Sequence, residues 1–354
     1  MYKYVLSTFF LIVLMVNKAF AETKEDYAKV FRMVKDEYLN EFSLDKFAVA
    51  GILALNKIDK DLKIFPAVDN FGFIYSDGRQ SVFMKPKDLE SPEQWGEAVE
   101  KIVVESAKYS PQIQLHDFEL FDVIIGAAFK TLDEFSKYYP SIEDEDNAVQ
   151  IKKYFGFHME EDILYIKLKT FNKVTFLKTK KALEENSQAK GLIVDLRGNS
   201  GGMLSEAIKV ADLFLDEGSL IVSTKGKGDV PPTAYIAKDP DSWEDKPIVI
   251  IVDAGTASSA EMFAVALKEQ GRAMLIGTKT FGKGTVQNLK LLNHDKGFAL
   301  TNAYYYSPQE KSLHKQGIDP DVCLSKKVSG CGKQDRENKA EDIESAKELI
   351  KQYL

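Results

Sequence analysis

Ser258 is the residue of this sequence whose setting first suggests chemistry. It stands in AGTASSAEMF (residues 254–263), and Glu261 follows it by three residues, ahead of an apolar periodic run. That spacing is typical of a helix capping box, in which the hydroxyl binds a free backbone N–H. A hydroxyl at a helix N-terminus beside small residues is also where a nucleophile benefits from the positive end of the helix dipole. Ser258 is therefore a candidate cap and a candidate nucleophile, and the second role requires a base.

Lys283 is the base that the chain returns to the vicinity of Ser258. The expected helix rises about 16–18 Å, and a returning strand of five or six residues covers a similar length. The returning segment, RAMLIGTKTFGKGTVQ (residues 272–287), carries Lys283 between two glycines and near Phe281. Glycines permit close approach of the backbone, and an aromatic wall could remove water from an amine. Ser258 and Lys283 are therefore candidates for a Ser-Lys dyad.

A lysine needs a depressed pKa to act as a base near neutral pH. Its ordinary pKa is about 10.4, and lowering it by about three units costs about 4 kcal/mol. For Lys283 alone, a surface lysine in a glycine-rich turn is the simpler interpretation. A Ser-His-Asp triad is assembled in space, so the sequence leaves that alternative open. The histidines show no metal-ligand spacing, and they are His116, His158, His294 and His314.

The segment GTKTFGKGT (residues 277–285) almost matches a phosphate-binding loop. It carries Gly284 where that loop needs a Ser or Thr to hold Mg²⁺. The residues that follow, TVQNLKLL, read as a strand, whereas a phosphate-binding loop opens a helix. We interpret the match as accidental and predict no nucleotide, cofactor or metal.

A second glycine-rich element, DLRGNSGG (residues 195–202), lies at a strand-to-helix junction. Successive backbone N–H groups in such a turn can bind an anion, including a tetrahedral oxyanion. A tight turn that needs positive φ is the equally plausible alternative. If Ser258 is the nucleophile, an oxyanion hole would combine the N–H of Gly201 or Gly202 with that of Ser259.

The elements that must position these residues belong to an α/β domain. ILYIKLKTF, GLIVDLRG and KPIVIIVDAG are apolar runs, and helical patterns follow the last two. Strands that are apolar on both faces and alternate with helices predict a mostly parallel sheet covered by helices. One apolar stripe on the helix after DLRGNSGG predicts packing on that sheet; it comprises Leu204, Ala207, Ile208, Ala211, Phe214 and Leu215.

The first half of the chain has a different pattern. Residues 22–62, 93–108 and 117–139 place apolar residues at helical spacing. FGFIYSDGRQSVFM (residues 71–84) predicts a β-hairpin that turns at Asp77-Gly78. The acidic segment PSIEDEDNAVQ (residues 140–150) is the expected linker. The chain ends in an amphipathic helix, which we interpret as a surface brace.

Composition and the N-terminus indicate an exported protein. Residues 1–21 hold a lysine, a short apolar run and an A-x-A signal, the pattern of a cleavable signal peptide. An uncleaved anchor is the alternative, but the run is shorter than a membrane span requires. Cleavage would remove two of the 47 Lys and Arg residues and none of the 54 Asp and Glu residues, changing the net charge from −7 to −9. So acidic a chain is a poor candidate for binding nucleic acid or anionic lipid.

Cys323 and Cys331 are the two cysteines of the chain. In an exported protein we expect them to form a disulfide, worth about 2–3 kcal/mol for so short a loop. Two free thiols are the alternative, and one isolated pair does not indicate a metal site.

Taken together, these motifs resemble those of the C-terminal processing (tail-specific) proteases of serine peptidase family S41. The resemblance covers about residues 160–325 and includes LTNAYYYSPQEKSLHKQGIDPDV. It implies a crotonase-like (Clp-protease-like) β-β-α superhelix and maps the nucleophile to Ser258, because the family nucleophile lies 25 residues before the lysine of F-G-K-G. The base then maps to Lys283 and the residue that orients it to Gln287. The oxyanion glycine maps to the Gly201-Gly202 pair.

The chain departs from the family pattern in one large respect. Relatives usually carry a PDZ domain of about 80–90 residues before the strand that matches LYIKLKTF, and residues 140–162 are too few for one. Recognition of substrate tails through a PDZ domain is therefore in doubt, and a partner protein could replace it. The role of the hairpin and the oligomeric state are not predicted.

These inferences define a PDZ-less, exported serine endopeptidase of mixed α/β (α+β) fold, placed in the periplasm or cell envelope if the source is bacterial. The alternative is a peptide-binding scaffold of the same fold with little or no activity. The expected segments are a signal peptide (1–21), a mainly helical region with a hairpin (22–150), a catalytic domain (151–328) and a C-terminal helix (329–354).

Overall fold

The computed structural model groups the chain into two compact units. Unit 1 comprises the described residues of 1–144 and 287–302, and unit 2 those of 145–286 and 303–354. The described residues are 23–67, 70–76, 78–84, 89–115, 117–141, 154–227, 232–244, 246–292, 296–324, 331 and 339–354. The expected signal peptide and most of the expected linker lie outside them. No helix in these ranges is long and apolar enough to cross a membrane.

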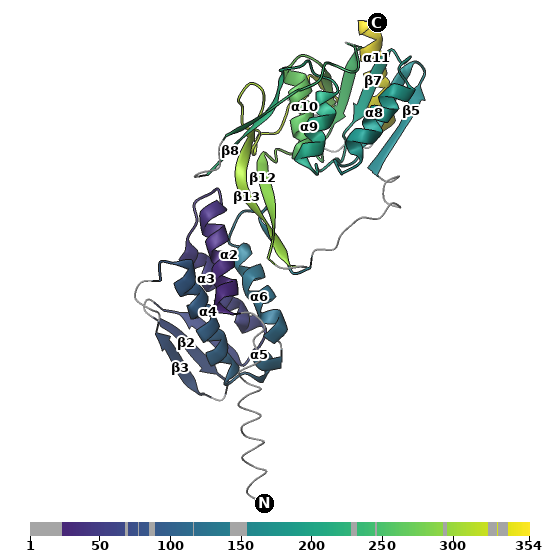
Figure 1. Cartoon of the computed structure of the whole chain (residues 1–354). Coiled ribbons are helices and arrows are strands. Elements are labelled where there is room, and N and C mark those ends of the chain that lie inside the picture. The colour runs from purple at the N-terminus through teal and green to yellow at the C-terminus, as the bar shows by residue number, and fades with distance from the viewer. Residues whose placement is uncertain are drawn as a thin grey trace, which may run out of the picture. The chain divides into compact units, whose positions relative to one another are not determined.

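Unit 1 is built on helices that pack in pairs, as Figure 1 shows. Helix α2 (Lys24–Glu37) packs on α4 (Pro92–Ala107), where Gly96 permits close approach because a Cβ there would lie 2.4 Å from the Lys24 carbonyl oxygen. Helix α3 (Leu44–Leu53) packs on α6 (Asp117–Phe129). Short helices connect these pairs: η1 (Ala54–Lys57) and α5 (Pro111–Leu115). Aromatic and aliphatic side chains fill the core between them.

A three-stranded antiparallel sheet, β1-β2-β3, belongs to the same unit. Strands β2 (Asn70–Tyr75) and β3 (Gln80–Met84) form the predicted hairpin, which is confirmed. Strand β1 (Leu62–Pro66) was not predicted, because a five-residue run that ends in proline is a weak strand signal. Phe71 and Phe73 on β2 face the helices and are fully buried, as period-2 alternation requires.

The predicted helix over residues 117–139 was wrong after residue 129. Helix α6 ends at Phe129, and Asp133 then holds a turn by accepting the backbone N–H groups of Phe135 at 2.8 Å and Ser136 at 2.9 Å. Residues 137–139 form strand β4 (Lys137–Tyr139), which pairs with the start of β13 (Gly297–Tyr306). A carboxylate that binds the backbone nearby competes with helix formation.

Unit 2 contains a six-stranded sheet in the order β14-β11-β10-β7-β6-β5. All pairs are parallel except β5 with β6, so the predicted mostly parallel sheet is confirmed. The strands are β5 (Phe155–Glu160), β6 (Ile163–Leu168), β7 (Gly191–Asp195), β10 (Ile248–Val252), β11 (Met274–Gly277) and β14 (Val322–Cys323).

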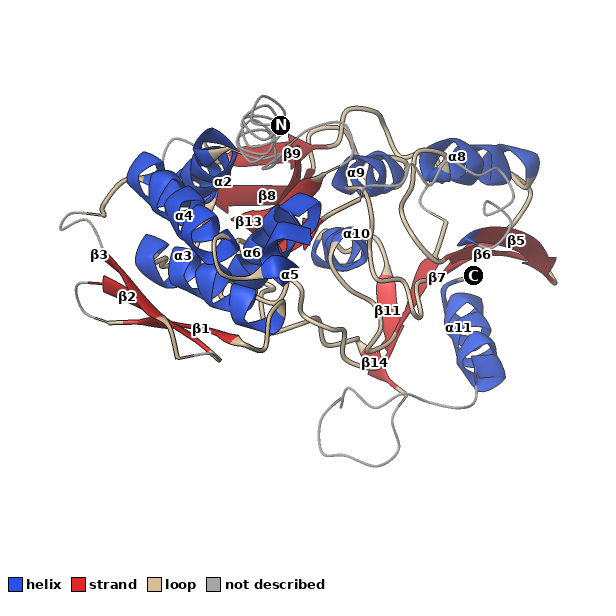
Figure 2. Ribbon diagram, turned by 90° about the horizontal axis from the view of Figure 1, so that it is seen from below, coloured by secondary structure: helices blue, strands red, loops and turns tan. Residues whose placement is uncertain are grey.

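Alternate residues of each strand enter two separate cores. On β10, Ile250 and Val252 face the core that α8 (Thr175–Glu185), α9 (Leu204–Asp212) and α10 (Ser259–Glu269) build. Val249 and Ile251 face the other core, which α11 (Lys339–Tyr353) covers. Figure 2 shows α11 on one side of the sheet and α8 and α9 on the other. The predicted stripe on α9 packs into the first core, as expected.

Further strands complete the unit. Strand β8 (Leu220–Gly226) pairs with β9 (Thr233–Ile236) and with residues 303–306 of β13. Strand β12 (Thr285–Leu291) begins two residues after Lys283, and from residue 287 onward it is grouped with unit 1. A disulfide joins Cys323 to Cys331. A mainly helical first part followed by an α/β domain agrees with the expected fold class.

Candidate active site

Two loops meet at the carboxyl ends of neighbouring parallel strands. The glycine loop (residues 196–202) follows β7, and the serine loop (residues 253–258) follows β10. Ligands of open α/β sheets bind at this edge. Three hydrogen bonds join the loops: Gly198 N–H to Asp253 Oδ1 at 2.9 Å, Ala257 N–H to the Asn199 carbonyl at 2.9 Å, and Thr256 Oγ1 to the Leu196 carbonyl at 3.0 Å.

Ser258 occupies a strained backbone conformation at the start of α10. Its φ of 56° and ψ of −127° lie outside the regions that residues with a Cβ prefer. Such a conformation costs about 1–3 kcal/mol and persists only where the surroundings enforce it. A serine on a sharp, strained turn between a strand and a helix presents its hydroxyl at the top of the sheet, as in nucleophile elbows.

Glu261 holds the backbones of Ser258 and Lys283 at one carboxylate oxygen. Its Oε2 accepts the Ser258 N–H at 3.0 Å and the Lys283 N–H at 2.8 Å. Those two nitrogens are therefore no more than about 6 Å apart. The structure thus brings the predicted nucleophile and the predicted base together, and it does so through the residue that sequence reasoning treated only as part of a helix cap.

The other oxygen of Glu261 extends this contact along the lysine segment. Its Oε1 accepts the Gly282 N–H at 2.8 Å and the Thr280 hydroxyl. Glu261 is fully buried, and burial raises the pKa of its carboxyl while these four hydrogen bonds oppose the shift. With four donors, both oxygens of the carboxylate are fully used. We expected the Phe281 ring to shield the Lys283 amine from water. Phe281 is 44% exposed, so that shielding is only partial.

The glycine loop lies directly against Ser258. A Cβ on Gly201 would lie 2.8 Å from the Ser258 Cβ, and the φ of Gly201 is 105°. A Cβ on Gly202 would lie 2.2 Å from the carbonyl oxygen of Phe171, and its φ is 134°. Both positions therefore exclude any residue larger than glycine.

The two glycines differ in whether their N–H groups are engaged. The Gly201 N–H donates to Asn199 Oδ1 at 2.9 Å. By contrast, the N–H groups of Gly202 and Ser259 donate no hydrogen bond to a side chain or a loop carbonyl among the described residues. The sequence could not choose between Gly201 and Gly202, and this hydrogen bond favours Gly202 as the available donor.

Gln287 is grouped by its contacts with unit 1, whereas Ser258 and Lys283 belong to unit 2. It lies on β12, and its Nε2 donates to Thr301 Oγ1 at 3.3 Å. Thr301 Oγ1 in turn donates to Asp133 Oδ1 at 3.2 Å. Its orienting role towards Lys283 remains a prediction.

The described histidines have structural neighbours. The His314 ring stacks on Tyr304 with ring centroids 5.0 Å apart, and its backbone lies against Gly284. His158 is exposed and pairs with Glu160. His116 and His294 lie outside the described residues.

Comparison with known proteins agrees with the site. Residues 162–324 match peptidase family S41. This stretch of the chain is similar to the peptidases of family S41. This confirms the resemblance that the motifs indicate, and the stretch includes Ser258, Lys283 and the glycine loop. The matched range begins close to β6 and ends just after β14.

About half of the chain is similar to several processing proteases. It is 38% identical over 174 residues to a carboxy-terminal-processing protease of Bartonella bacilliformis, covering 48% of this chain and 40% of that protein. It is 34% identical over 178 residues to carboxy-terminal processing protease CtpA of Bacillus subtilis, covering 50% of this chain and 38% of that protein. The chain thus spans about two fifths of these relatives' length.

Among solved structures, the photosystem II D1 C-terminal processing protease is 32% identical, with a TM-score of 0.40. That match covers 48% of this chain and 45% of the other.

Proposed function

We propose that this chain is an exported serine endopeptidase that cleaves protein substrates near their C-termini. Ser258 Oγ attacks the carbonyl carbon of the scissile peptide bond while neutral Lys283 accepts its proton. Lys283 then delivers that proton to the leaving amine, and water hydrolyses the acyl-enzyme by the reverse route. Gln287 orients the Lys283 amine. The N–H groups of Gly202 and Ser259, beside the Gly201 backbone, bind the oxyanion.

One observation carries this proposal. The Glu261 carboxylate binds the backbone N–H of Ser258 and that of Lys283 on a single oxygen, at 3.0 and 2.8 Å. A structural helix cap needs the first contact and has no use for the second. A dyad needs both, because a misplacement of about 1 Å between reacting groups can cost about a hundredfold in rate.

The names of the relatives support the substrate class. The similar proteins from Bartonella and Bacillus are carboxy-terminal processing proteases, and we extend that preference to this chain. The signal-like residues 1–21 support export to a cell-envelope compartment. Because the sequence lacks room for a PDZ domain before β6, we propose that a partner protein supplies substrates.

The test uses purified protein of residues 22–354 with an unfolded, C-terminally tagged protein as substrate. We expect new C-termini by mass spectrometry with the wild type and none with Ser258→Ala or Lys283→Ala. A fluorophosphonate probe should label the wild type and leave Ser258→Ala unlabelled. Activity should also rise with pH, since only a neutral lysine accepts a proton.

His314→Gln is the matched control for the base, because His314 is the histidine whose backbone lies beside the lysine segment. It should retain cleavage. Normal cleavage by Lys283→Ala together with loss in His314→Gln would assign the base to the histidine. A wild type that binds peptides and cleaves none of them would contradict the peptidase proposal.

A further inference from the structure

The first turn of α11 carries a buried carboxylate, that of Asp342. A helix that served only as a surface brace would not need one. Its apolar residues Ala346 and Ile350 pack on the sheet, as its amphipathic pattern predicts. Asp342, in its first turn, is also buried, with 4% of its surface exposed. A buried carboxylate is costly unless it is paired and hydrogen-bonded. Its partner therefore shows what the start of α11 is fixed to.

That partner is Arg197, the second residue of the glycine loop. Arg197 Nη1 donates to Asp342 Oδ2 at 2.9 Å, and both side chains are 6% exposed. The same guanidinium binds Asp195, from Nε to Oδ1 at 3.0 Å and from Nη2 to Oδ2 at 2.6 Å. Lys167 adds a second cation, 2.8 Å from Asp195. The cluster thus holds two carboxylates and two cations, and Asp342 completes its charge balance.

The cluster also fixes the backbone that leads to the proposed oxyanion hole. Lys167 Nζ donates to the Arg197 carbonyl at 2.7 Å, and the Arg197 N–H donates to Asp195 Oδ1 at 2.9 Å. Two residues later, Asn199 accepts the Ala257 N–H on its carbonyl and the Gly201 N–H on its side chain, each at 2.9 Å. A shift of Arg197 would therefore move the glycine loop against Ser258.

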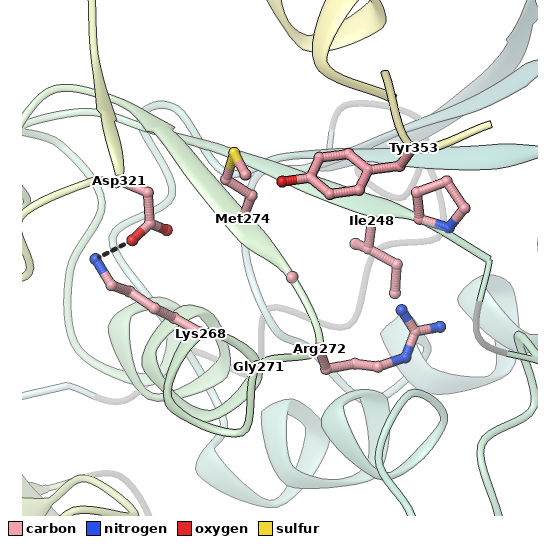
Figure 3. A pocket seen from close by; sticks show the side chains of 9 residues that line it. Ile248, Lys268, Gly271, Arg272, Met274, Asp321 and Tyr353 are labelled. Carbon is pink, nitrogen blue, oxygen red and sulfur yellow. Dashed lines mark ion pairs between the residues drawn. The ribbon is translucent and has the colours of Figure 1, made fainter. Parts of the chain in front are cut away.

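The opposite end of α11 is held less firmly. Its last turn places Tyr353 beside a cavity of about 480 Å³ at the amino ends of β10 and β11. Figure 3 shows the Tyr353 ring near the side chains of Met274 and Ile248, and 63% of the Tyr353 surface is exposed. The pocket's ion pair, Lys268 with Asp321, does not involve α11. The helix also pairs Lys347 and Lys351 with the exposed Glu161, but the ion pair of its first turn is the one with both side chains buried.

We propose that Asp342 is a positioning residue of the active site, acting through Arg197 on the glycine loop. The first turn of α11 thus supports the active site, although the helix lies on the sheet face opposite α9 and α10. This inference rests on the proposed peptidase function. Removing one member of a buried ion pair leaves the other uncompensated, so Arg197 should move when Asp342 loses its charge.

The test compares Asp342→Asn, which keeps the shape of the side chain and removes its charge, with Lys351→Gln. Lys351 also lies on α11, but its pair with Glu161 is exposed. We expect kcat of Asp342→Asn to fall about tenfold to a hundredfold with KM within about twofold of the wild type, because the loop stabilises the transition state more than the substrate. Labelling by the fluorophosphonate should slow in parallel. Lys351→Gln should match the wild type.

Asp342→Glu keeps the charge on a longer side chain and should recover part of the lost kcat. A wild-type kcat in Asp342→Asn, even with a lower melting temperature, would overturn the inference and leave the peptidase proposal intact. If the Asn variant does not fold, Asp342→Ser takes its place, and a wild-type kcat in that variant would overturn the inference. A wild type that neither cleaves nor reacts with the probe would contradict the peptidase proposal and this inference together.

Discussion

Ser258 occupies a backbone conformation that costs free energy, and its neighbours supply what holds it there. Its N–H is bound by Glu261, and the adjoining Ala257 N–H is bound by the Asn199 carbonyl. Gly201 lies so close that it cannot carry a side chain. The position of one hydroxyl therefore depends on three residues that perform no chemistry themselves.

Glu261→Gln tests the carboxylate that binds the backbones of Ser258 and Lys283. Each carboxylate oxygen of Glu261 accepts two hydrogen bonds. The glutamine side chain would replace one of these oxygens by an NH₂ group, which cannot accept, so two of the four hydrogen bonds would be lost. We expect kcat to fall at least about a hundredfold, because Ser258 and Lys283 lose a shared anchor. Steady-state kinetics measure this effect. Glu269→Gln, at the other end of α10, is the control and should retain activity; equal rates in both variants would exclude an anchoring role.

Gly201→Ala tests the close approach of the glycine loop. The added methyl would lie 2.8 Å from the Ser258 Cβ at a φ of 105°, so the loop or the serine must move. We expect a loss of activity of about a hundredfold and a stability cost of about 1–3 kcal/mol. Gly218→Ala is the control, because its φ is 88° and no atom lies within 4 Å of the added Cβ. It should lose stability without losing activity, and an active Gly201→Ala would refute the packing argument.

At the scale of elements, the buried charge cluster joins β6, β7 and α11. Each contributes a group that would be unfavourable alone: Lys167 from β6, Asp195 from β7 and Asp342 from α11. Burial disfavours the Asp195 carboxylate, but the hydrogen bond from Arg197 and the charge of Lys167 outweigh burial and lower its pKa to about 2. The ion pairs that hold β6, β7 and α11 together therefore depend on Asp195 remaining ionised, and so on pH.

This coupling predicts acid sensitivity. Because the pKa of Asp195 is lower in the folded chain than in the unfolded chain, its contribution is complete above about pH 4 and is lost as pH falls towards 2. This pKa shift contributes about 2 kcal/mol to the free energy of unfolding. Urea unfolding from pH 5 to pH 2 measures it. Asp195→Asn should be less stable at pH 5 and show a shallower acid slope; identical slopes would mean that Asp195 does not titrate as inferred.

At the scale of the whole molecule, each unit has its own core and its own tryptophan. Trp95 is fully buried in the core of unit 1, and Trp243 is 1% exposed in a core of unit 2. The chain passes between the units near residues 144, 286 and 302. The two tryptophans can therefore report on the unfolding of each unit separately.

Phe47→Ala tests whether the cores are separate. Phe47 is fully buried in unit 1, and such a truncation costs about 3–5 kcal/mol. We expect the fluorescence transition of Trp95 to move to lower denaturant concentration more than that of Trp243. Variants with one tryptophan replaced by phenylalanine make the two signals separable. Equal shifts would show that the chain unfolds as one cooperative unit.

Much of the fold could be predicted because the informative patterns are local. Apolar runs bounded by glycine or charge predicted the buried parallel strands, and alternation around a turn predicted the β2-β3 hairpin. The errors occurred where tertiary contacts outweigh local pattern. Strand β1 forms because β2 offers it a partner, and α6 stops early because Asp133 binds the backbone of the turn that follows.

The sequence by itself determined the S41 motifs and the spacing of Ser258 and Lys283, since residue type and separation along the chain are all that these require. The tertiary structure alone decided that Glu261 binds both backbones, that the Gly201 N–H is already engaged, and that Asp342 reaches Arg197. Hydrogen-bond direction and ion pairs between distant residues depend on how elements pack. Asp342 and Arg197 stand 145 residues apart, and no local period relates them.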